Sequence, residues 1–213
     1  MRLTVCTPTH SGDLHYSTVA TLLRLQAWAL TGDHAFSHLV MRSPWVAFAR
    51  DRLAQQALDG GATHVLYLDA DVGVSTPSFV DRLDALGVDI AGALYYSKPV
   101  IGDGRSGQCE PPPFSSARVH PERGECRPLR PPQRGVVRDV LIGGGCMLVR
   151  RSVFERLPAP WFQFRESVVD GERRMFPEDW TFCEAALDAG MTTAVDCDIA
   201  TDHYGACGWR HSA

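Results

Sequence analysis

The stretch THVLYLDADV, residues 63–72, decides how the rest of the chain is interpreted. The apolar run from Val65 to Leu68 predicts a short strand that is buried on both faces. Asp69 and Asp71 follow it directly. Because alternate residues of an extended backbone point to one side, we expect these two carboxylates to project together. Ligands of open α/β sheets bind beyond the carboxyl ends of the strands, which is where this pair falls.

Two carboxylates in this place have a chemical and an ordinary interpretation. Hard oxygen ligands suit a divalent cation, and a divalent cation suits a diphosphate. An Asp-x-Asp triplet is also common by chance, so Asp69 and Asp71 can be turn residues that simply follow a strand. The surrounding motifs decide between the two.

Composition limits the class of protein. The chain has 213 residues, of which 45% are hydrophobic and 22% charged, as is typical of a globular domain. No apolar run approaches the roughly 18 residues that span a bilayer, and the first residues do not form a signal peptide. Seven cysteines without a Cys-x-x-Cys pair predict reduced thiols in a cytoplasmic protein, several of them in the core. The net charge of −4 gives no overall attraction to nucleic acid or membrane.

Strand-like and helix-like segments alternate along the chain, which predicts an α/β fold with a mainly parallel sheet and helices on both faces. We expect a single domain over residues 1–213. Asp13 is the expected cap of the first helix. The strands are expected at 2–7, 36–41, 65–68, 88–95, 136–141, 146–149 and 192–197, and the helices at 13–30, 46–58, 76–86, 152–157 and 177–190.

The alternation stops over residues 97–135, which are rich in Pro, Gly and Arg. This composition predicts a long loop without regular structure, either a functional lid or an excursion. Clustered arginines can contact the phosphates of nucleic acid, although arginines in a polar loop are more often simply solvated. The arginines in and beside this loop are Arg105, Arg118, Arg123, Arg127, Arg130, Arg134 and Arg138.

Several further motifs occur in a fixed order around the Asp-x-Asp triplet, and together they resemble the GT-A fold glycosyltransferases. Within these the chain is similar to the family 2-like enzymes, including the short versions common in phages and bacteria. The resemblance covers nearly the whole chain. Its motifs are Thr7-Pro8-Thr9-His10, Asp69-Ala70-Asp71, Gly92 to Tyr96 with Lys98-Pro99, Gly143 to Phe154, Pro177 to Cys183, and Asp202-His203.

The resemblance implies a Rossmann-like GT-A domain that transfers a hexosyl or pentosyl group from a UDP- or GDP-linked sugar to an acceptor hydroxyl, with inversion. It implies Mn²⁺ or Mg²⁺ as the cofactor, and an imidazole ligand favours Mn²⁺. Processive synthesis is not expected, because the Gln-x-x-Arg-Trp motif and membrane helices are missing from the sequence. The location would be the cytoplasm, or the host cytoplasm if a phage encodes the protein. The implied metal ligands are Asp69, Asp71 and His203, and the implied nucleotide-sugar site is Thr7, Pro8, Thr9, Arg50, Asp69, Ala70 and Asp71.

On the acceptor side, Asp179 is the candidate general base and Glu178 is the alternative. Both acids can also be caps in the first turn of a helix. The glycines 143–145 would let backbone approach the sugar or acceptor closely, or they form a tight turn that needs positive φ. Trp180 is either an acceptor platform or a core residue. Arg52, unlike Arg50, is expected on a solvated helix face.

The acceptor stays open between a hydroxymethylated base of phage DNA, reached through the Arg-rich loop, and a glycan or small molecule. Two other functions are compatible with the fold. One is an inactive GT-A module that binds a nucleotide-sugar, although such a module would not need Asp69, Asp71, Asp179 and His203 together. The other is a nucleotidyltransferase, which would need a Gly-rich basic loop after the first strand. Residues 6–13, at the end of the first strand and after it, have Gly12 as their single glycine and contain neither Lys nor Arg.

Overall fold

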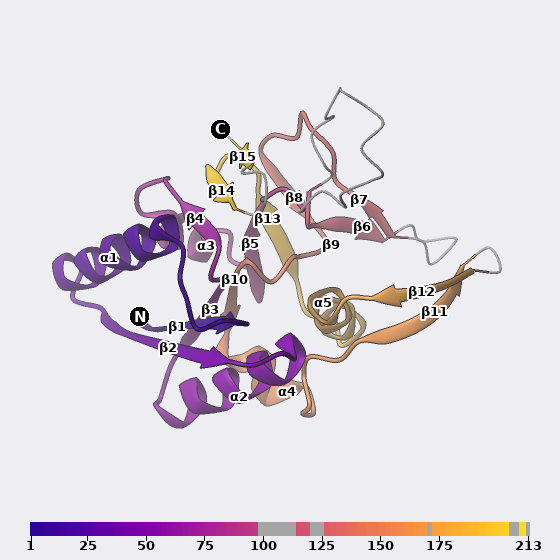
Figure 1. Ribbon diagram of the computed structural model, residues 1–213, viewed down its shortest axis with the longest axis horizontal. Coiled ribbons are helices and arrows are strands. Elements are labelled where there is room, and N and C mark those ends of the chain that lie inside the picture. The colour runs from indigo at the N-terminus through magenta and orange to yellow at the C-terminus, as the bar shows by residue number, and fades with distance from the viewer. Residues whose placement is uncertain (98–113, 120–125, 170–171, 205–208, 212–213) are drawn as a thin grey trace.

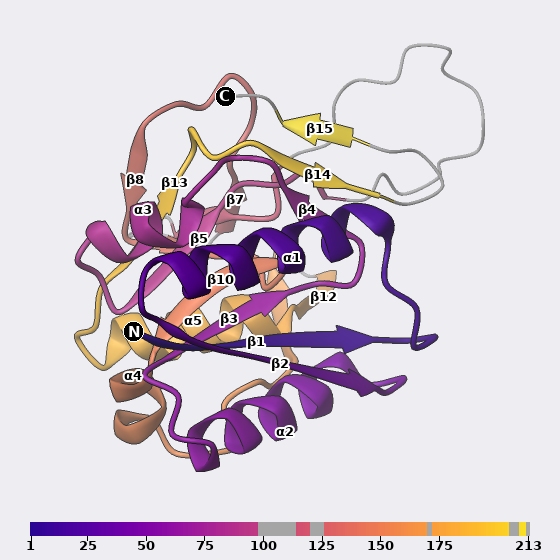
Figure 2. The ribbon, with the colours of Figure 1, turned by 90° about the vertical axis from the view of Figure 1, so that its left-hand side faces the viewer.

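A seven-stranded sheet forms the centre of the computed structural model, which describes residues 1–97, 114–119, 126–169, 172–204 and 209–211. Figures 1 and 2 show the sheet from two sides. In spatial order its strands are β2 (Ala35–Arg42), β1 (Arg2–Thr9), β3 (His64–Leu68), β10 (Cys146–Arg150), β5 (Ile90–Ala93), β13 (Thr193–Asp196) and β8 (Val136–Arg138).

Five of these strands run in one direction, which confirms the mainly parallel sheet. β1 is parallel to β2 and β3, and β5 is parallel to β13. β10 and β8 run the other way, because β10 is antiparallel to both β3 and β5, and β8 to β13. Cys146, the first residue of β10, therefore pairs with Leu68, the last residue of β3. This pairing brings the glycines 143–145 to the edge where the Asp-x-Asp triplet lies.

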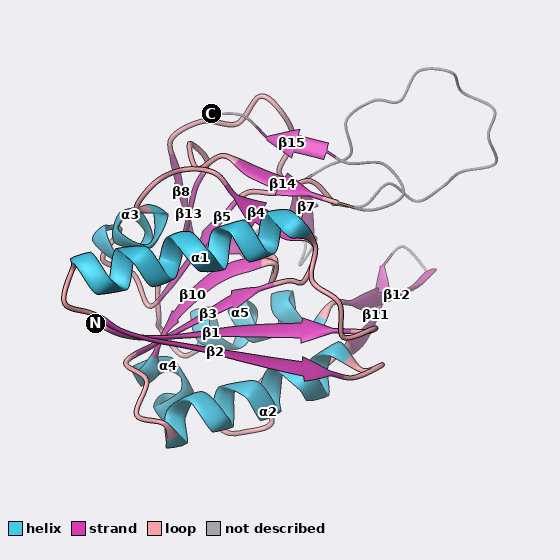
Figure 3. Cartoon of the chain, turned by 60° about the vertical axis from the view of Figure 1, so that its left-hand side comes forward, coloured by secondary structure: helices cyan, strands magenta, loops and turns pink. Residues whose placement is uncertain are grey.

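Helices cover both faces of the sheet (Figure 3). Along β3, Val65 and Tyr67 belong to one buried cluster and Leu66 and Leu68 to the other, so the strand is buried on both faces, as its apolar run predicted. The first cluster packs under α2 (Val46–Asp59), α4 (Arg151–Arg156) and α5 (Glu178–Asp188), and the second under α1 (Tyr16–Thr31) and α3 (Phe79–Ala85).

The start of α1 differs from the prediction. Its cap is His15 rather than Asp13, and the His15 side chain accepts a hydrogen bond from the backbone N–H of Ser17. The backbone N–H of His15 also donates to the carbonyl of Ala70 at 2.8 Å. This contact connects the beginning of α1 to the Asp-x-Asp loop. Helix-capping preferences in the sequence do not predict a contact between segments so far apart.

The prediction of a structureless loop over 97–135 is wrong for the part that the structure describes. β6 (Ala117–Val119) and β7 (Cys126–Pro128) form a three-stranded antiparallel sheet with β9 (Val140–Leu141). Phe114 and Leu129 are buried in the core, and the Phe114 ring stacks on Tyr96 at 4.8 Å. Strands of two or three residues carry no readable periodicity, and Pro128 at the end of an edge strand masks the signal further. Residues 98–113 and 120–125 lie outside the described part.

Two smaller sheets complete the edge that carries the Asp-x-Asp loop. β11 (Arg165–Val169) and β12 (Glu172–Phe176) form a hairpin beside α5 (Figure 1). β14 (Thr201–His203) lies between β4 (Val72–Val74) and β15 (Trp209–His211). Of the cysteines in the described residues, all are free thiols and four are buried, as expected. No helix in the described part is long and apolar enough to cross a membrane.

Candidate active site

The pairing of β4 with β14 brings two predicted metal ligands together. Asp71 immediately precedes β4, and His203 ends β14 opposite Val72. The Oδ1 atom of Asp71 lies 3.5 Å from Nε2 of His203. The backbone N–H of Tyr204 donates to the Asp71 carbonyl at 2.9 Å, which fixes the crossing of the two segments.

The ring of His203 is held in one orientation. Its Nδ1 lies 2.5 Å from the carbonyl oxygen of Tyr96, so Nδ1–H donates to that oxygen. Tyr95 packs edge-on against the same ring with centroids 5.2 Å apart. A neutral imidazole bonded in this way presents the lone pair of Nε2 to the Asp71 carboxylate. Two acceptors that face each other need a cation or a proton between them.

The side chains of Asp71 and His203 could supply part of the coordination of a metal ion. Neighbouring ligand atoms on one octahedral divalent ion are about 3 Å apart, close to the separation of Asp71 and His203. Asp69 is engaged elsewhere through one of its two oxygens, because Oδ1 accepts from Nη2 of Arg50 at 3.0 Å. Among the described residues no group of three or more His, Cys, Asp and Glu side chains is arranged to hold a metal. A bound cation would thus take two protein ligands and leave positions for ligand oxygens.

The extended backbone from which we expected Asp69 and Asp71 to project together is not observed, although both residues line the same cleft. β3 ends at Leu68, and the N–H of Val72 donates to the carbonyl of Asp69 at 3.1 Å. Residues 69–72 therefore form a turn and not an extended strand, so the alternation of side chains does not continue into the triplet.

Arg50 forms a second centre at the same edge of the sheet. The residue is 2% exposed, and its guanidinium reaches three different segments. Nη2 donates to Asp69 after β3, Nε donates to Oε1 of Glu178 at the start of α5 at 3.1 Å, and Nη1 donates to the carbonyl of Gly144 at 3.0 Å. Burial alone would lower the pKa of Arg50, but Asp69 and Glu178 outweigh it and raise that pKa, so the guanidinium is ionised.

This position differs from the one that the resemblance implied for Arg50. The resemblance placed Arg50 in the nucleotide-sugar site, where an arginine of similar enzymes reaches the diphosphate, whereas the structure places its guanidinium inside the protein with partners from the chain itself. Arg52, one half-turn further along α2, is exposed as expected.

The geometry distinguishes the two candidate bases. Glu178 is buried and ion-paired with Arg50. Asp179 accepts from the backbone N–H of Gly144 at 2.7 Å and of Trp180 at 2.8 Å. Burial first, and then the charge of Glu178, raise the pKa of Asp179 to about 7, against the opposing effects of Arg50 and the two N–H groups. A carboxyl with a pKa near neutrality suits a general base, so Asp179 is the better candidate.

The three glycines before β10 are needed for close approach and not for a special backbone angle. Residues 144 and 145 lie in a turn, but none of the glycines 143–145 has a positive φ, so the interpretation that the turn needs positive φ is wrong. A Cβ at Gly144 would lie 2.6 Å from Cζ of Arg50, and a Cβ at Gly145 would lie 2.6 Å from Cζ of Tyr95. A Cβ at Gly143 would lie 2.6 Å from Cβ of Ser115. Contact of this loop with a sugar or acceptor stays a prediction.

Replacing Gly144 with alanine is therefore expected to destabilise the protein by about 1–3 kcal/mol, because the new methyl group meets the buried guanidinium of Arg50. The measurement is the free energy of unfolding from urea denaturation. Gly60→Ala is the matched control, since a Cβ there meets only two carbonyl oxygens at 3.4 Å. Equal stability of the two variants would contradict the packing argument.

Trp180 is placed as a packing residue. Its Nε1–H donates to the carbonyl of Ser115 at 2.8 Å, and its ring packs edge-on against Phe176 with centroids 6.0 Å apart. The side chain is partly buried against the main core cluster. These contacts favour the core interpretation over the acceptor platform.

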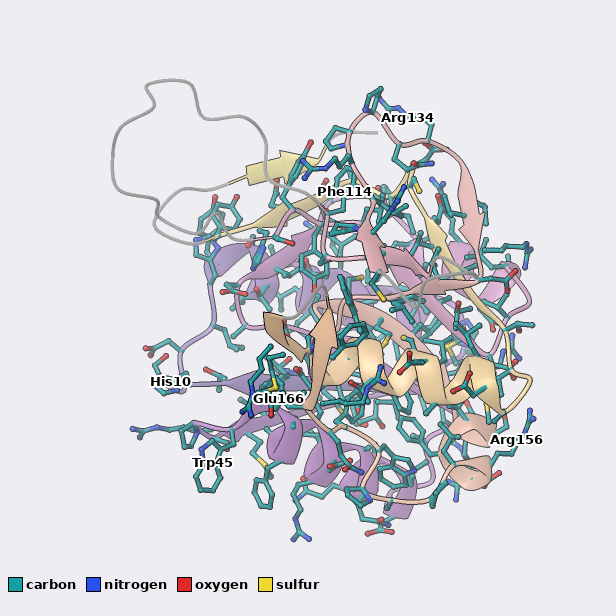
Figure 4. All side chains as sticks on the ribbon, turned by 90° about the vertical axis from the view of Figure 1, so that its right-hand side faces the viewer. His10, Trp45, Phe114, Arg134, Arg156 and Glu166 are labelled. Atoms are coloured by element: carbon teal, nitrogen blue, oxygen red, sulfur yellow. The ribbon has the colours of Figure 1, made fainter. Side chains whose placement is uncertain are left out.

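An open cleft of about 230 Å³ lies where β1, β2 and β3 end. Thr7 is fully buried with its hydroxyl 3.0 Å from Nε2 of His38, so it does not line the cleft, and neither does Arg50. Figure 4 shows His10 and Trp45 at this edge of the molecule. The lining residues are Pro8 and Thr9 at the end of β1 with His10 after it, Ser43, Pro44 and Val46 around the start of α2, and Asp69, Ala70 and Asp71 after β3.

The cleft thus contains five of the seven residues predicted for the nucleotide-sugar site, together with His10, which belongs to a recognised motif but was not assigned to the site, and three residues that sequence reasoning missed. The three are Ser43, Pro44 and Val46. A signal was available, because β1 and β2 were both predicted as strands of a parallel sheet and the residues that follow parallel neighbours meet at one edge.

Comparison with known proteins supports the fold. No protein-family model matches the sequence, and no curated protein matches it. The crystal structure of A197 from STIV superposes with a TM-score of 0.63 at 17% identity, over 96% of this chain and 86% of that chain. This likeness, with the observed sheet, confirms the expected α/β fold of the GT-A, Rossmann-like type.

Two other solved structures match more loosely. One is a glycosyltransferase involved in the glycosylation of the major capsid of PBCV-1, with a TM-score of 0.37 at 15% identity over 76% of this chain and 70% of that one. The other is a nucleoside-diphosphate-sugar pyrophosphorylase from Vibrio cholerae RC9, with a TM-score of 0.42 at 8% identity over 92% and 91%. Both superpositions are too loose for the activities of those proteins to bear on this chain.

Proposed function

We propose that the protein is a metal-dependent glycosyltransferase that moves one sugar from a UDP- or GDP-linked donor to an acceptor hydroxyl, with inversion. One observation carries the proposal. Asp71 and His203, which could bind a cation together, lie beside an open cleft. The carboxyl of Asp179, with its pKa raised to about 7, lies at the same edge of the sheet.

The donor is assigned to the cleft. Its nucleoside would lie between the ends of β1 and β2, with the diphosphate directed toward Asp71, which also lines the cleft. Asp71 and His203 would hold Mn²⁺ or Mg²⁺, and such an ion would stabilise the charge that develops on a diphosphate leaving group. The imidazole ligand favours Mn²⁺.

Asp179 is assigned as the general base. Its carboxylate takes the proton of the acceptor hydroxyl while that oxygen forms a bond to the anomeric carbon and the bond from that carbon to the nucleoside diphosphate breaks. The two backbone N–H groups that Asp179 accepts hold the carboxylate in place. Glu178 is assigned no proton transfer, because its carboxylate is buried against Arg50.

The acceptor is assigned only as a hydroxyl compound, and a hydroxymethylated base of DNA is one candidate. Among the described arginines of the former loop region, Arg134 pairs with Asp198 at 4.0 Å and Arg138 donates to the carbonyl of Leu86. The carboxylate of Asp198 offsets part of the charge of Arg134, whereas Arg138 keeps its full charge because a carbonyl is neutral. Salt-dependent DNA binding together with sugar transfer to hydroxymethylated DNA would support this acceptor, and the lack of both would exclude it.

Thermal unfolding with a panel of nucleotides and nucleotide-sugars, each with Mn²⁺ and with EDTA, tests the donor assignment. A ligand at a hundred times its dissociation constant adds about 2.7 kcal/mol to the free energy of unfolding, which raises the melting temperature visibly. We expect a rise with UDP or GDP compounds that needs the metal. A rise without sugar transfer to any acceptor would indicate an inactive binding module, and no rise with any nucleotide would refute the proposal.

A further inference from the structure

We propose that Arg50 is a positioning residue that orients the base Asp179 through Gly144, and that it does not bind the diphosphate of the donor. The proposal deepens the proposed function, because it assigns the residue that organises the acceptor side of that site. It stands on the contacts of a single buried guanidinium.

Arg50 connects the segments that build the site. Asp69 follows β3, Gly144 precedes β10 and Glu178 begins α5, and each accepts one hydrogen bond from the guanidinium at 3.0 or 3.1 Å. A planar guanidinium can reach three acceptors in fixed directions, which the ammonium of a lysine does not reproduce. Arg50 therefore links all three segments, in addition to the β3–β10 pairing and the backbone bond from Asp69 N–H to the Gly145 carbonyl that join the first two.

Gly144 passes the position of Arg50 on to Asp179. The carbonyl of Gly144 accepts from Arg50, and its N–H donates to Oδ2 of Asp179. The guanidinium also packs directly on this residue, since a Cβ at Gly144 would lie 2.6 Å from Cζ of Arg50. A displacement of Arg50 would thus move the group that holds the base.

The charges around Asp179 give Arg50 a second effect. Asp69 and Glu178 are acids bonded to Arg50. Burial raises the pKa of Tyr95 well above its usual range and that of the Cys183 thiol to about 12, so both are neutral near pH 7. Arg50 is the cation that lowers the pKa of Asp179, and Glu178 is the anion that raises it.

The cleft gives Arg50 no direct access to the donor. The residue is 2% exposed and is not among the nine residues of the lining. Asp69 lies between them, because it lines the cleft and is bonded to Arg50. The guanidinium can therefore affect the donor only through that carboxylate.

A titration of the Asp179 carboxyl tests the proposal without any substrate. The protein is labelled with ¹³C at the aspartate carboxyls, and Asp179→Asn assigns the resonance. Arg50→Met should raise the pKa of Asp179 by about one unit or more, and Glu178→Gln should lower it by a similar amount. Arg52→Met, an exposed arginine on the same helix, is the matched control and should leave the titration unchanged. Shifts of opposite sign would show that both charges act on the Asp179 carboxyl.

The binding of UDP or GDP with Mn²⁺ is measured on the same variants. Arg50→Lys, which keeps the charge and loses the three-way contact, should retain the nucleotide affinity of the natural protein within a few fold. A tenfold or greater loss of affinity, with the titration of Asp179 unmoved, would make Arg50 a diphosphate ligand and overturn the proposal. If Arg50→Met does not fold, Arg50→Lys and Glu178→Gln decide the question. A different outcome is that the Asp179 pKa shifts in opposite directions in Arg50→Met and Glu178→Gln while the natural protein transfers no sugar. That combination would refute the proposed function but not the effect of Arg50 on Asp179.

Discussion

Asp71→Ala is expected to lower the rate of sugar transfer by about a thousandfold or more. The side chain supplies one of two cation ligands, and a cation at a leaving diphosphate contributes several kcal/mol of transition-state stabilisation, at 1.36 kcal/mol for each tenfold in rate. The fold should survive, because the Asp71 side chain is about one-third exposed and its backbone contact with Tyr204 does not need the carboxylate. Steady-state transfer with Mn²⁺ present is the measurement.

Two further variants test whether the loss in Asp71→Ala comes from the missing cation ligand. His203→Ala removes the other ligand and should cause a loss of similar size, as should EDTA on the natural protein. Asp188→Ala removes an exposed acid at the far end of α5 and should leave transfer unchanged. Full activity of Asp71→Ala, with the same dependence on Mn²⁺ as the natural protein, would show that the cation binds elsewhere.

Asp179→Asn is expected to lower kcat by about a hundredfold to ten-thousandfold, because an amide cannot take the proton of the acceptor hydroxyl. Nucleotide binding should change little, since Asp179 does not line the cleft. In the natural protein the rate should rise with pH and level off above about 7, because burial and Glu178 raise the pKa of Asp179 to about that value and only the deprotonated carboxylate can act. This rise should be missing from the residual activity of Asp179→Asn.

Glu178→Gln separates the two acids. The variant should keep most of its activity, and its pH profile should move to lower pH, because the anion that raises the pKa of Asp179 is gone. A loss in Glu178→Gln as large as that in Asp179→Asn, with a pH profile that still rises near 7 in Asp179→Asn, would identify Glu178 as the base.

Much of the fold was predictable because its elements have simple local patterns. The apolar run before Asp69 indicated a strand buried on both faces, and Leu66 and Tyr67 do pack in opposite clusters. The helix that starts at Glu178 and the glycines 143–145 were also recognised. The strands at 117–119 and 126–128 were missed, because each is held by pairing with other strands and not by a pattern of its own.

The sequence by itself determined which residues are available for chemistry: an Asp-x-Asp triplet after a buried strand, a late histidine, and two acids at the start of a helix. Only the tertiary structure decided how they combine. Asp71 pairs with His203 because β4 and β14 are neighbours, and Asp69 pairs with Arg50 because residues 69–72 form a turn that directs the two aspartates to different partners. Both outcomes depend on contacts between segments far apart in the chain, and local periodicity carries no information about such contacts.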